Sequence, residues 1–153
     1  MASAAETFRD HDHGHCVAAA LAAAEAACAG RGLQLTRARK RVLEILLESH
    51  RAIGAYDLLE RLVAEGRSAQ PPTVYRALAF LTDQGFAHRI ERLNAYIACA
   101  RPGCAHDPAF LICRGCGMVA ESDARQLAPA AGGFRIDSTV VEAQGLCPAC
   151  QAT

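Results

Sequence analysis

Hydrophobic residues recur at helical spacing in four segments of the first half of the chain. The first is an alanine-rich stretch, residues 16–29, that two glycines end. The second follows Thr36, a residue suited to cap a helix, and carries an apolar stripe over residues 38–47. Two further helices are predicted over residues 55–65 and 73–84, and a glycine closes each of them.

The last of these helices has two chemically different faces. Val74 belongs to the apolar face, whereas Tyr75 and Arg76 lie in the first turn and point the other way. We place Pro71 and Pro72 in a linker ahead of the helix, because proline is excluded from helix interiors. A third helix with exposed Tyr and Arg side chains in its first turn is typical of the recognition helix of a helix-turn-helix, which enters the major groove.

Alternating apolar and polar residues follow, and they predict a β-hairpin. Residues 86–91 and 96–99 form the two strands, with residues 93–94 as the turn between them. Three helices followed by a hairpin are the order of a winged helix. With a two-residue turn at this position, His88 faces Cys99 across the hairpin, close enough for the two side chains to bind one ion.

The rest of the chain predicts a small domain of mixed structure. Residues 100–108 contain proline and glycine and form a plausible hinge. Residues 109–121 predict two strands around a tight turn, residues 123–133 a short helix, and residues 134–144 a further strand. About 60 residues with few aromatic side chains make a thin core, so a bound metal and a dimer partner would both add stability.

Two Cys-x-x-Cys pairs in this region have the spacing of a metal site. Cys113 and Cys116 form the first pair, and Cys147 and Cys150 form the second. Four thiolates at this spacing favour a closed, tetrahedral structural zinc site. The alternatives are two disulfides or free thiols. They are disfavoured because the N-terminus lacks the basic and apolar segments of a secretory signal.

The predicted fold class is therefore α+β: an N-terminal winged-helix DNA-binding domain and a small C-terminal α/β dimerisation domain stapled by a four-cysteine zinc site. The predicted boundaries are a disordered tail over residues 1–15, the winged helix over residues 16–98, a hinge over residues 99–108 and the zinc-binding domain over residues 109–153.

Charge is unevenly distributed although the net charge is zero. Residues 31–92 carry 11 Lys and Arg against seven Asp and Glu, a net of +4, whereas residues 1–30 and 93–153 have net charges of −3 and −1. Four of the basic residues crowd the helix after Thr36: Arg37, Arg39, Lys40 and Arg41. Cations are unfavourable at a helix N-terminus, so we expect them either to bind DNA phosphate or to form a solvated basic face.

Cellular location follows from what the sequence lacks. No apolar run approaches the ~20 residues of a membrane span, and eight cysteines without a secretory signal favour the reducing cytoplasm. The tail contains His11, His13 and His15, which we assign to a disordered end, with loose metal binding as the alternative.

Several motifs resemble one family of regulators. The sequence Pro-Pro-Thr-Val-Tyr-Arg-Ala-Leu over residues 71–78, followed by Gln-Gly-Phe over residues 84–86, is similar to the recognition helix of the ferric-uptake-regulator (Fur) family. Residues 110–117 and 145–150, which hold the cysteine pairs, resemble that family's structural zinc motifs. The resemblance covers residues 33–150 and implies a dimeric repressor that binds AT-rich palindromic DNA when it is loaded with metal.

Within that family the chain resembles the zinc-uptake-regulator branch. It lacks the histidine-rich run that iron and peroxide sensors carry before the first cysteine pair. The resemblance instead implies a regulatory zinc site made by His88, Cys99, His106 and Glu121. Two imidazoles, a thiolate and a carboxylate suit tetrahedral zinc better than manganese. Cys104 is a further thiol nearby that could substitute for a ligand.

The resemblance also implies how the chain works. We expect two zinc ions per chain, one structural and one that fixes the angle between the domains, and no enzymatic activity. An iron-, manganese- or peroxide-responsive repressor is the alternative. The partners expected are double-stranded DNA and a second copy of the chain, with no membrane. The expected DNA contacts are Arg37, Arg39, Tyr56, Thr73, Tyr75 and Arg76.

Overall fold

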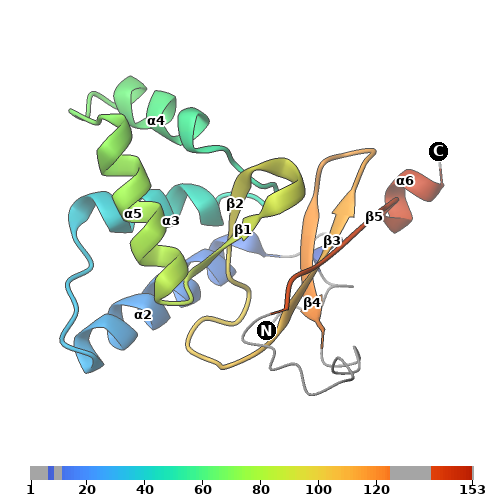
Figure 1. The fold of residues 1–153 in the computed structure, drawn as a ribbon, viewed down its shortest axis with the longest axis horizontal. Coiled ribbons are helices and arrows are strands. Elements are labelled where there is room, and N and C mark those ends of the chain that lie inside the picture. The colour runs from blue at the N-terminus through green and yellow to red at the C-terminus, as the bar shows by residue number, and fades with distance from the viewer. Residues whose placement is uncertain (1–6, 9–11, 125–138, 153) are drawn as a thin grey trace, which may run out of the picture.

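The computed structural model describes residues 7–8, 12–124 and 139–152, which form two parts joined by a short connection (Figure 1). The N-terminal part contains α2 (His13–Gly30), α3 (Arg37–Leu47), α4 (Ala55–Ala64), α5 (Pro71–Asp83), β1 (Ala87–Ile90), the 3₁₀ turn η1 (Glu91–Leu93) and β2 (Ala95–Ala98). The C-terminal part contains β3 (Pro108–Cys113), β4 (Val119–Asp123), β5 (Val141–Gly145) and α6 (Pro148–Gln151). None of the helices in these ranges has the length and apolar character needed to cross a bilayer.

Helices α3, α4 and α5 lie close to their predicted positions and form a helical core with α2. The Thr36 hydroxyl accepts a hydrogen bond from the Arg39 N–H at 3.3 Å, so Thr36 caps α3 as predicted. The linker prediction for Pro71 is wrong, because α5 begins there. The first N–H groups of a helix have no partner within it, so proline is tolerated in the first turn. Gly85 ends the helical segment with a φ of 77°, a conformation that favours glycine.

The apolar stripes of these helices meet in one core. Its most buried side chains are Val42, Ile45, Leu46, Leu58, Val74, Leu78, Leu81 and Phe86. These are the residues that the helical periodicity places inward, together with Phe86, which follows Gly85 at the end of α5. The core therefore fixes the direction in which α5 presents its outer face.

Helix α2 begins at His13, three residues before the predicted start. The Asp12 carboxylate accepts a hydrogen bond from the His15 N–H at 3.3 Å and caps the helix. Two of the three histidines assigned to a disordered tail are therefore helical, and His11 lies outside the described residues. Cys28 is buried in the core that α2 shares with α3.

The register of the β1–β2 hairpin differs from the prediction. The loop consists of η1 and Asn94, which has a φ of 46°, so it is longer than the two-residue turn expected. His88 consequently pairs with Ile97 and not with Cys99. The register shift is two residues, which keeps the alternation of side chains. His88 and Cys99 thus remain diagonal neighbours on one face of the hairpin.

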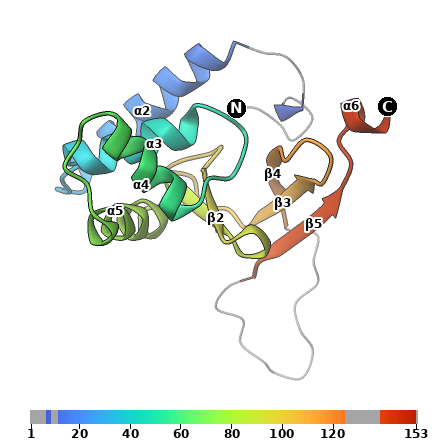
Figure 2. The same ribbon diagram turned by 90° about the horizontal axis from the view of Figure 1, so that it is seen from above.

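The C-terminal part is a three-stranded sheet with the order β4-β3-β5 (Figure 2). Strands β3 and β4 are antiparallel around the first cysteine pair, as predicted, and β5 runs parallel to β3 on the other side. The helix predicted to begin at Asp123 does not begin there, since Asp123 is the last residue of β4. Residues 125–133 of that helix, and residues 134–138 of the strand predicted after it, lie outside the described residues.

The hairpin packs directly against the sheet. Its side chains Ile90 and Ile97 form a second buried cluster with Phe110, Ile112 and Val119 of β3 and β4. The segment predicted as a simple turn, residues 50–54, adds backbone links to both sides. The Val119 N–H donates to the His50 carbonyl at 2.7 Å, and Ile53 forms a β-bridge with Tyr96.

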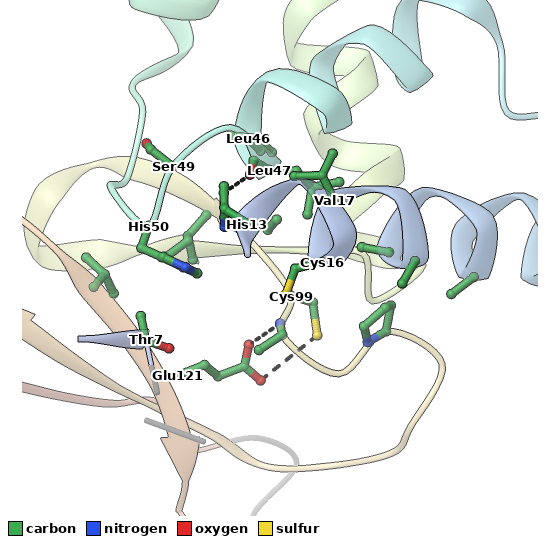
Figure 3. Close-up of a pocket in the computed structure, with 18 of the residues that line it drawn as sticks. Thr7, His13, Cys16, Val17, Leu46, Leu47, Ser49, His50, Cys99 and Glu121 are labelled. Atoms are coloured by element: carbon green, nitrogen blue, oxygen red, sulfur yellow. Dashed lines mark hydrogen bonds between the residues drawn. The ribbon is translucent and has the colours of Figure 1, made fainter. Parts of the chain in front are cut away.

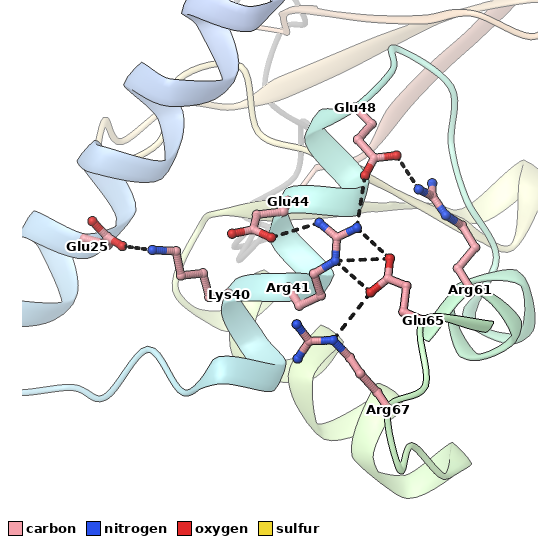
Figure 4. A network of polar contacts seen from close by, with 8 residues as sticks. All are labelled: Glu25, Lys40, Arg41, Glu44, Glu48, Arg61, Glu65 and Arg67. Atoms are coloured by element: carbon pink, nitrogen blue, oxygen red, sulfur yellow. Dashed lines mark hydrogen bonds and ion pairs between the residues drawn. The ribbon is translucent and has the colours of Figure 1, made fainter. Parts of the chain in front are cut away.

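Two residues of the predicted basic cluster of α3 form ion pairs within the protein (Figure 4). Lys40 pairs with Glu25 of α2. The Arg41 guanidinium contacts Glu65 at 2.6 Å, Glu44 at 2.9 Å and Glu48 at 3.4 Å, so it joins α3 to the end of α4. The hydrogen bonds with Glu65 and then with Glu44 raise the pKa of Arg41 above its ordinary value.

We therefore expect Arg41→Ala to lower the free energy of unfolding by about 1–2 kcal/mol, since three carboxylates lose the cation they share. Arg37→Ala is the matched control, because Arg37 is an exposed residue of the same helix. It should change stability by less than about 0.5 kcal/mol in urea unfolding. Equal losses in the two variants would contradict a structural role for the network.

Candidate metal centres and nucleic-acid interface

The two cysteine pairs converge at one end of the C-terminal sheet. Cys113 ends β3, Cys116 lies in the turn that follows, and Cys147 and Cys150 lie at the start of α6 and within it. The four sulfur atoms all lie within 4.8 Å of one another, and the sulfur atoms of Cys116 and Cys147 are 3.8 Å apart. A tetrahedron with Zn–S bonds of ~2.3 Å has edges of about 3.8 Å, so the cluster could hold a zinc ion.

The local backbone explains why the pairs can approach. A Cβ atom at Gly115 would lie 3.0 Å from the sulfur of Cys150 and 3.1 Å from its Cβ atom, so a side chain there would crowd the cluster. The backbone N–H groups of Cys116 and Cys147 point at the sulfur of Cys113 and lower its pKa below its usual range. Hydrogen bonds with Cys147 and then with Cys113 raise the pKa of Cys150. Four ionised thiols are therefore stable together only around a cation.

A second cluster lies between the two parts of the chain. It contains His88 of β1, Cys99 just after β2, His106 of the connection and Glu121 of β4, and its ligand atoms all lie within 4.8 Å of one another. The Cys99 sulfur is 3.7 Å from His106 Nε2 and 4.0 Å from Glu121 Oε1. His106 Nε2 is 2.5 Å from Glu121 Oε1. These are the four regulatory ligands that the family resemblance implies.

The surroundings of this cluster fit a cation. His106 Nδ1 is 2.6 Å from the Cys104 carbonyl, which leaves Nε2 directed at Glu121. His88 Nε2 is buried and has no hydrogen-bond partner among the described residues, and it lies 3.5 Å from Glu121 Oε2. A buried ring nitrogen without a partner costs free energy, which a metal ion at this position would remove.

The charges of the two anionic ligands are set by opposing effects. Burial, and then the nearby Glu121 carboxylate, raise the pKa of Cys99 to about 12. Burial also acts to raise the pKa of Glu121, but the His88 ring 3.5 Å away and the hydrogen bond from the Ala100 N–H outweigh it and leave this pKa below its ordinary value. At neutral pH the cluster therefore holds one carboxylate and one protonated thiol before any ion binds.

Backbone groups that no sequence pattern marks complete the site. The Ala100 N–H donates to Glu121 Oε2 at 2.8 Å, and the Arg101 N–H donates to the Cys99 sulfur at 3.4 Å. Cys104, considered as a substitute ligand, belongs to neither sulfur-containing cluster among the described residues and contributes its carbonyl instead. Only the fold shows these roles, because they depend on chain path and not on residue type.

A cavity of about 400 Å³ adjoins this cluster beneath α2 (Figure 3). Cys99 and Glu121 form part of its wall, and Cys16 points towards them from α2. At the opposite end His13 stacks edge-on against His50 with ring centroids 4.7 Å apart, and His13 Nε2 is 2.6 Å from the Leu47 carbonyl. This contact ties the start of α2 to the end of α3, so His13 has a structural role that the tail prediction did not include.

Exposed residues on α4 and α5 form the candidate DNA surface. Because α5 begins at Pro71, Tyr75 and Arg76 lie in its second turn and not in the first turn as predicted. Tyr75 is 47% exposed, Arg76 is exposed, and Thr73 in the first turn is half-buried. Tyr56, at the start of α4, is 67% exposed. These positions agree with a recognition helix whose N-terminal half exposes Tyr75 and Arg76, and their contact with DNA stays a prediction.

Arg37 and Arg39 are the two residues of α3 among the predicted DNA contacts, and they differ in the partners that they have within the protein. Arg37 is exposed. Arg39 lies 3.8 Å from the centre of the Phe80 ring and donates to the Gln34 carbonyl at 2.7 Å. Arg39 thus already has partners within the protein, so Arg37 is the more available of the two for phosphate.

Comparison with known proteins gives consistent matches. The model of the ferric uptake regulator family matches residues 30–132. The zinc uptake regulation protein of Escherichia coli (strain K12) is 43% identical over 129 aligned positions, and the match covers 78% of this chain and 74% of that protein.

Solved structures match as well. A zinc uptake regulator complexed with zinc and DNA has a TM-score of 0.81 at 42% identity, covering 89% of this chain and 95% of that one. The holo form of XcZur has a TM-score of 0.76 at 36% identity and covers 87% and 97% of the two chains. The apo form, also at 36% identity, covers 88% and 97% with a TM-score of only 0.53. The arrangement of the two parts is thus closer to the holo form than to the apo form.

The raised pKa of Cys99 predicts that filling the second cluster with zinc releases about one proton at neutral pH, because the thiol must ionise to bind a metal. Zinc affinity should then rise about tenfold per pH unit through the neutral range. Calorimetric titration in buffers of different ionisation enthalpy, on protein whose four-cysteine site is already filled, measures this proton. A release of close to zero protons per zinc bound would show that the Cys99 thiol is already ionised in the zinc-free cluster.

Proposed function

Because the chain belongs to the ferric uptake regulator family, in its zinc-uptake-regulator branch, we propose that it is a zinc-responsive repressor that binds DNA when the interdomain cluster is filled. It is a regulator of transcription and not an enzyme. The observation that carries the proposal is the convergence of four zinc-type ligands from the hairpin, the connection and the C-terminal sheet. Zinc bound there would supply the charge that holds these three segments together.

The consequence for DNA binding follows from the positions of the ligands. His88 lies in the hairpin next to α5, and Glu121 lies in the sheet. Bringing these side chains together fixes the orientation of the helical part, and so of α5, relative to the sheet. When the cluster is empty, the two parts are free to sample other angles, few of which present α5 correctly to DNA.

We further propose that two copies assemble through the C-terminal sheet. Leu111 on β3 is 37% exposed, and beside it lies a depression of about 350 Å³ lined by Ala143, Leu146 and Phe8 among others. An apolar sheet face of this kind is suited to a partner. Two recognition helices held by such a dimer fit a palindromic operator, which we expect to be AT-rich from the family resemblance.

The metal content that we propose is two zinc ions per chain, one in each cluster. The four-cysteine cluster lies within one part of the chain, so its ion would stabilise the fold without setting the interdomain angle. The second cluster spans both parts, so it can empty without unfolding either. We place the protein in the cytoplasm, where DNA and a reducing environment are both present.

We expect zinc to be required for operator binding. His88→Ala or Cys99→Ser should abolish operator binding at any zinc concentration while leaving a folded dimer with one zinc per chain. Gel-shift titrations in buffered free zinc, with metal analysis of each variant, measure both. Cys113→Ser is the contrasting variant and should unfold the C-terminal part.

The reverse outcome, in which Cys99→Ser unfolds the protein and Cys113→Ser only weakens DNA binding, would show that the roles of the two clusters are exchanged. Parallel titrations with manganese and iron test the alternative that another metal is sensed. Tighter DNA binding with either of them than with zinc would overturn the zinc assignment.

Arg76→Ala should weaken specific DNA binding by about 1–3 kcal/mol, because an exposed arginine near the N-terminus of a recognition helix can bond a guanine edge. Arg31→Ala is the matched control. Arg31 donates to Gln84 at the opposite end of α5, at 3.0 Å, and α5 is roughly 20 Å long. Fluorescence anisotropy on operator and scrambled DNA distinguishes the two variants. Equal losses of operator affinity in the two variants would show that Arg76 does not contribute to specific recognition.

A further inference from the structure

A polar contact also joins the two parts away from both metal clusters, in addition to the apolar cluster between the hairpin and the sheet and the backbone links of residues 50–54. At the tip of the hairpin, the backbone N–H groups of Glu91 and Arg92 donate to the two oxygens of the Glu142 carboxylate, at 2.6 Å and 2.9 Å. The Arg92 guanidinium also donates to the side-chain oxygen of Gln144 at 3.2 Å. Glu142 and Gln144 belong to β5, beside which the tip of the hairpin lies (Figure 2).

The chemistry of this contact makes it more than a chance surface approach. The first N–H groups of a 3₁₀ turn have no acceptor within the turn, so Glu91 and Arg92 must find one outside it. A carboxylate that accepts both with one oxygen each forms charge-assisted hydrogen bonds, which are stronger than neutral ones. The donors are backbone groups, so the contact depends on the hairpin loop conformation and on Glu142 alone.

The position of this contact allows it to restrict the angle between the two parts. In the sheet order β4-β3-β5, Glu121 of the metal cluster is on one outer strand and Glu142 is on the other. The apolar contacts between the hairpin and the sheet are non-directional, so a polar attachment to β4 alone would leave the hairpin freer to rotate about it. Attachments to both outer strands fix the orientation as well as the distance.

We propose that Glu142 is an interdomain latch, a positioning residue that holds the hairpin tip against β5 and thereby raises the zinc affinity of the cluster formed by His88, Cys99, His106 and Glu121. Zinc binds only when His88 and Cys99 of the hairpin side meet Glu121 of the sheet. The apparent affinity therefore scales with the fraction of molecules in that arrangement. The latch increases this fraction before any ion arrives. Its effect on repression rests on the proposed function, whereas its effect on zinc binding does not.

The test compares Glu142→Ala with Glu91→Ala in the full-length protein with its four-cysteine site filled. Both substitutions remove one carboxylate at the same junction. The Glu91 side chain, however, pairs with Arg89 at 3.6 Å and not with β5, and it is 58% exposed. Zinc affinity is measured by competition with a chromogenic chelator, and amide hydrogen exchange of residues 91 and 92 is followed by NMR in zinc-free and zinc-loaded protein.

We expect Glu142→Ala to weaken zinc binding at the interdomain cluster about three- to tenfold and to remove exchange protection at both amides. Glu91→Ala should leave the zinc affinity and the protection of the Arg92 amide as in the wild type. Unprotected amides in the wild type, or equal zinc affinity in the wild type and Glu142→Ala, would overturn the latch. A loss with Glu91→Ala as large as that with Glu142→Ala would overturn it too, because charge alone would then explain both.

These readouts separate the latch from the proposed function. If zinc has no effect on DNA binding in the wild type, the repressor mechanism fails while the exchange and affinity data still test Glu142. If zinc-dependent DNA binding is found but Glu142→Ala binds zinc like the wild type, the repressor mechanism stands and the latch fails.

Discussion

The buried carboxylate of Glu121 is the group on which the relative placement of the two halves depends. One of its oxygens accepts from the Ala100 N–H and lies near His88, and the other lies against His106 and Cys99. A carboxylate in such a place is stable only if partners surround it, and here every partner comes from outside its own strand. The hairpin and the connection are therefore arranged around a single negative charge.

The two cysteine-containing clusters differ in what they connect. The four-cysteine cluster joins the end of β3 to α6 within one part, whereas the cluster around Glu121 joins elements of both parts. An ion in the first can only support local structure, and an ion in the second changes the orientation of the helices. This distinction of connectivity, more than ligand chemistry, separates a structural role from a regulatory one.

Residue periodicity predicts the helices, and the spacing of the two Cys-x-x-Cys pairs predicts the four-cysteine cluster, because both depend on side-chain type at short range. The second ligand set is distributed over residues 88–121, and only the family resemblance implied it in full. The hairpin register was predicted wrongly, since η1 and the left-handed Asn94 make a longer loop than a turn at residues 93–94 allows. The start of α5 at Pro71 and of α2 at His13 were missed because helix ends depend on caps that periodicity does not report. The contacts of Ala100, Cys104 and Glu142 depend on backbone groups brought together by the fold, so no sequence pattern could indicate them.

The ion pairs of α3 have a consequence for how the protein meets a polyanion. Lys40 and Arg41 are held by Glu25, Glu44, Glu48 and Glu65 within the same helical part, so their charges are already neutralised. Each phosphate neutralised by a protein cation releases condensed counterions and steepens the salt dependence of the association constant by ~0.9 in logarithmic slope. Cations that are already paired within the protein release few counterions from DNA. The affinity for DNA should therefore fall less steeply with salt than the number of basic residues suggests. Discrimination between DNA sequences would then rest more on base contacts than on general attraction to the backbone.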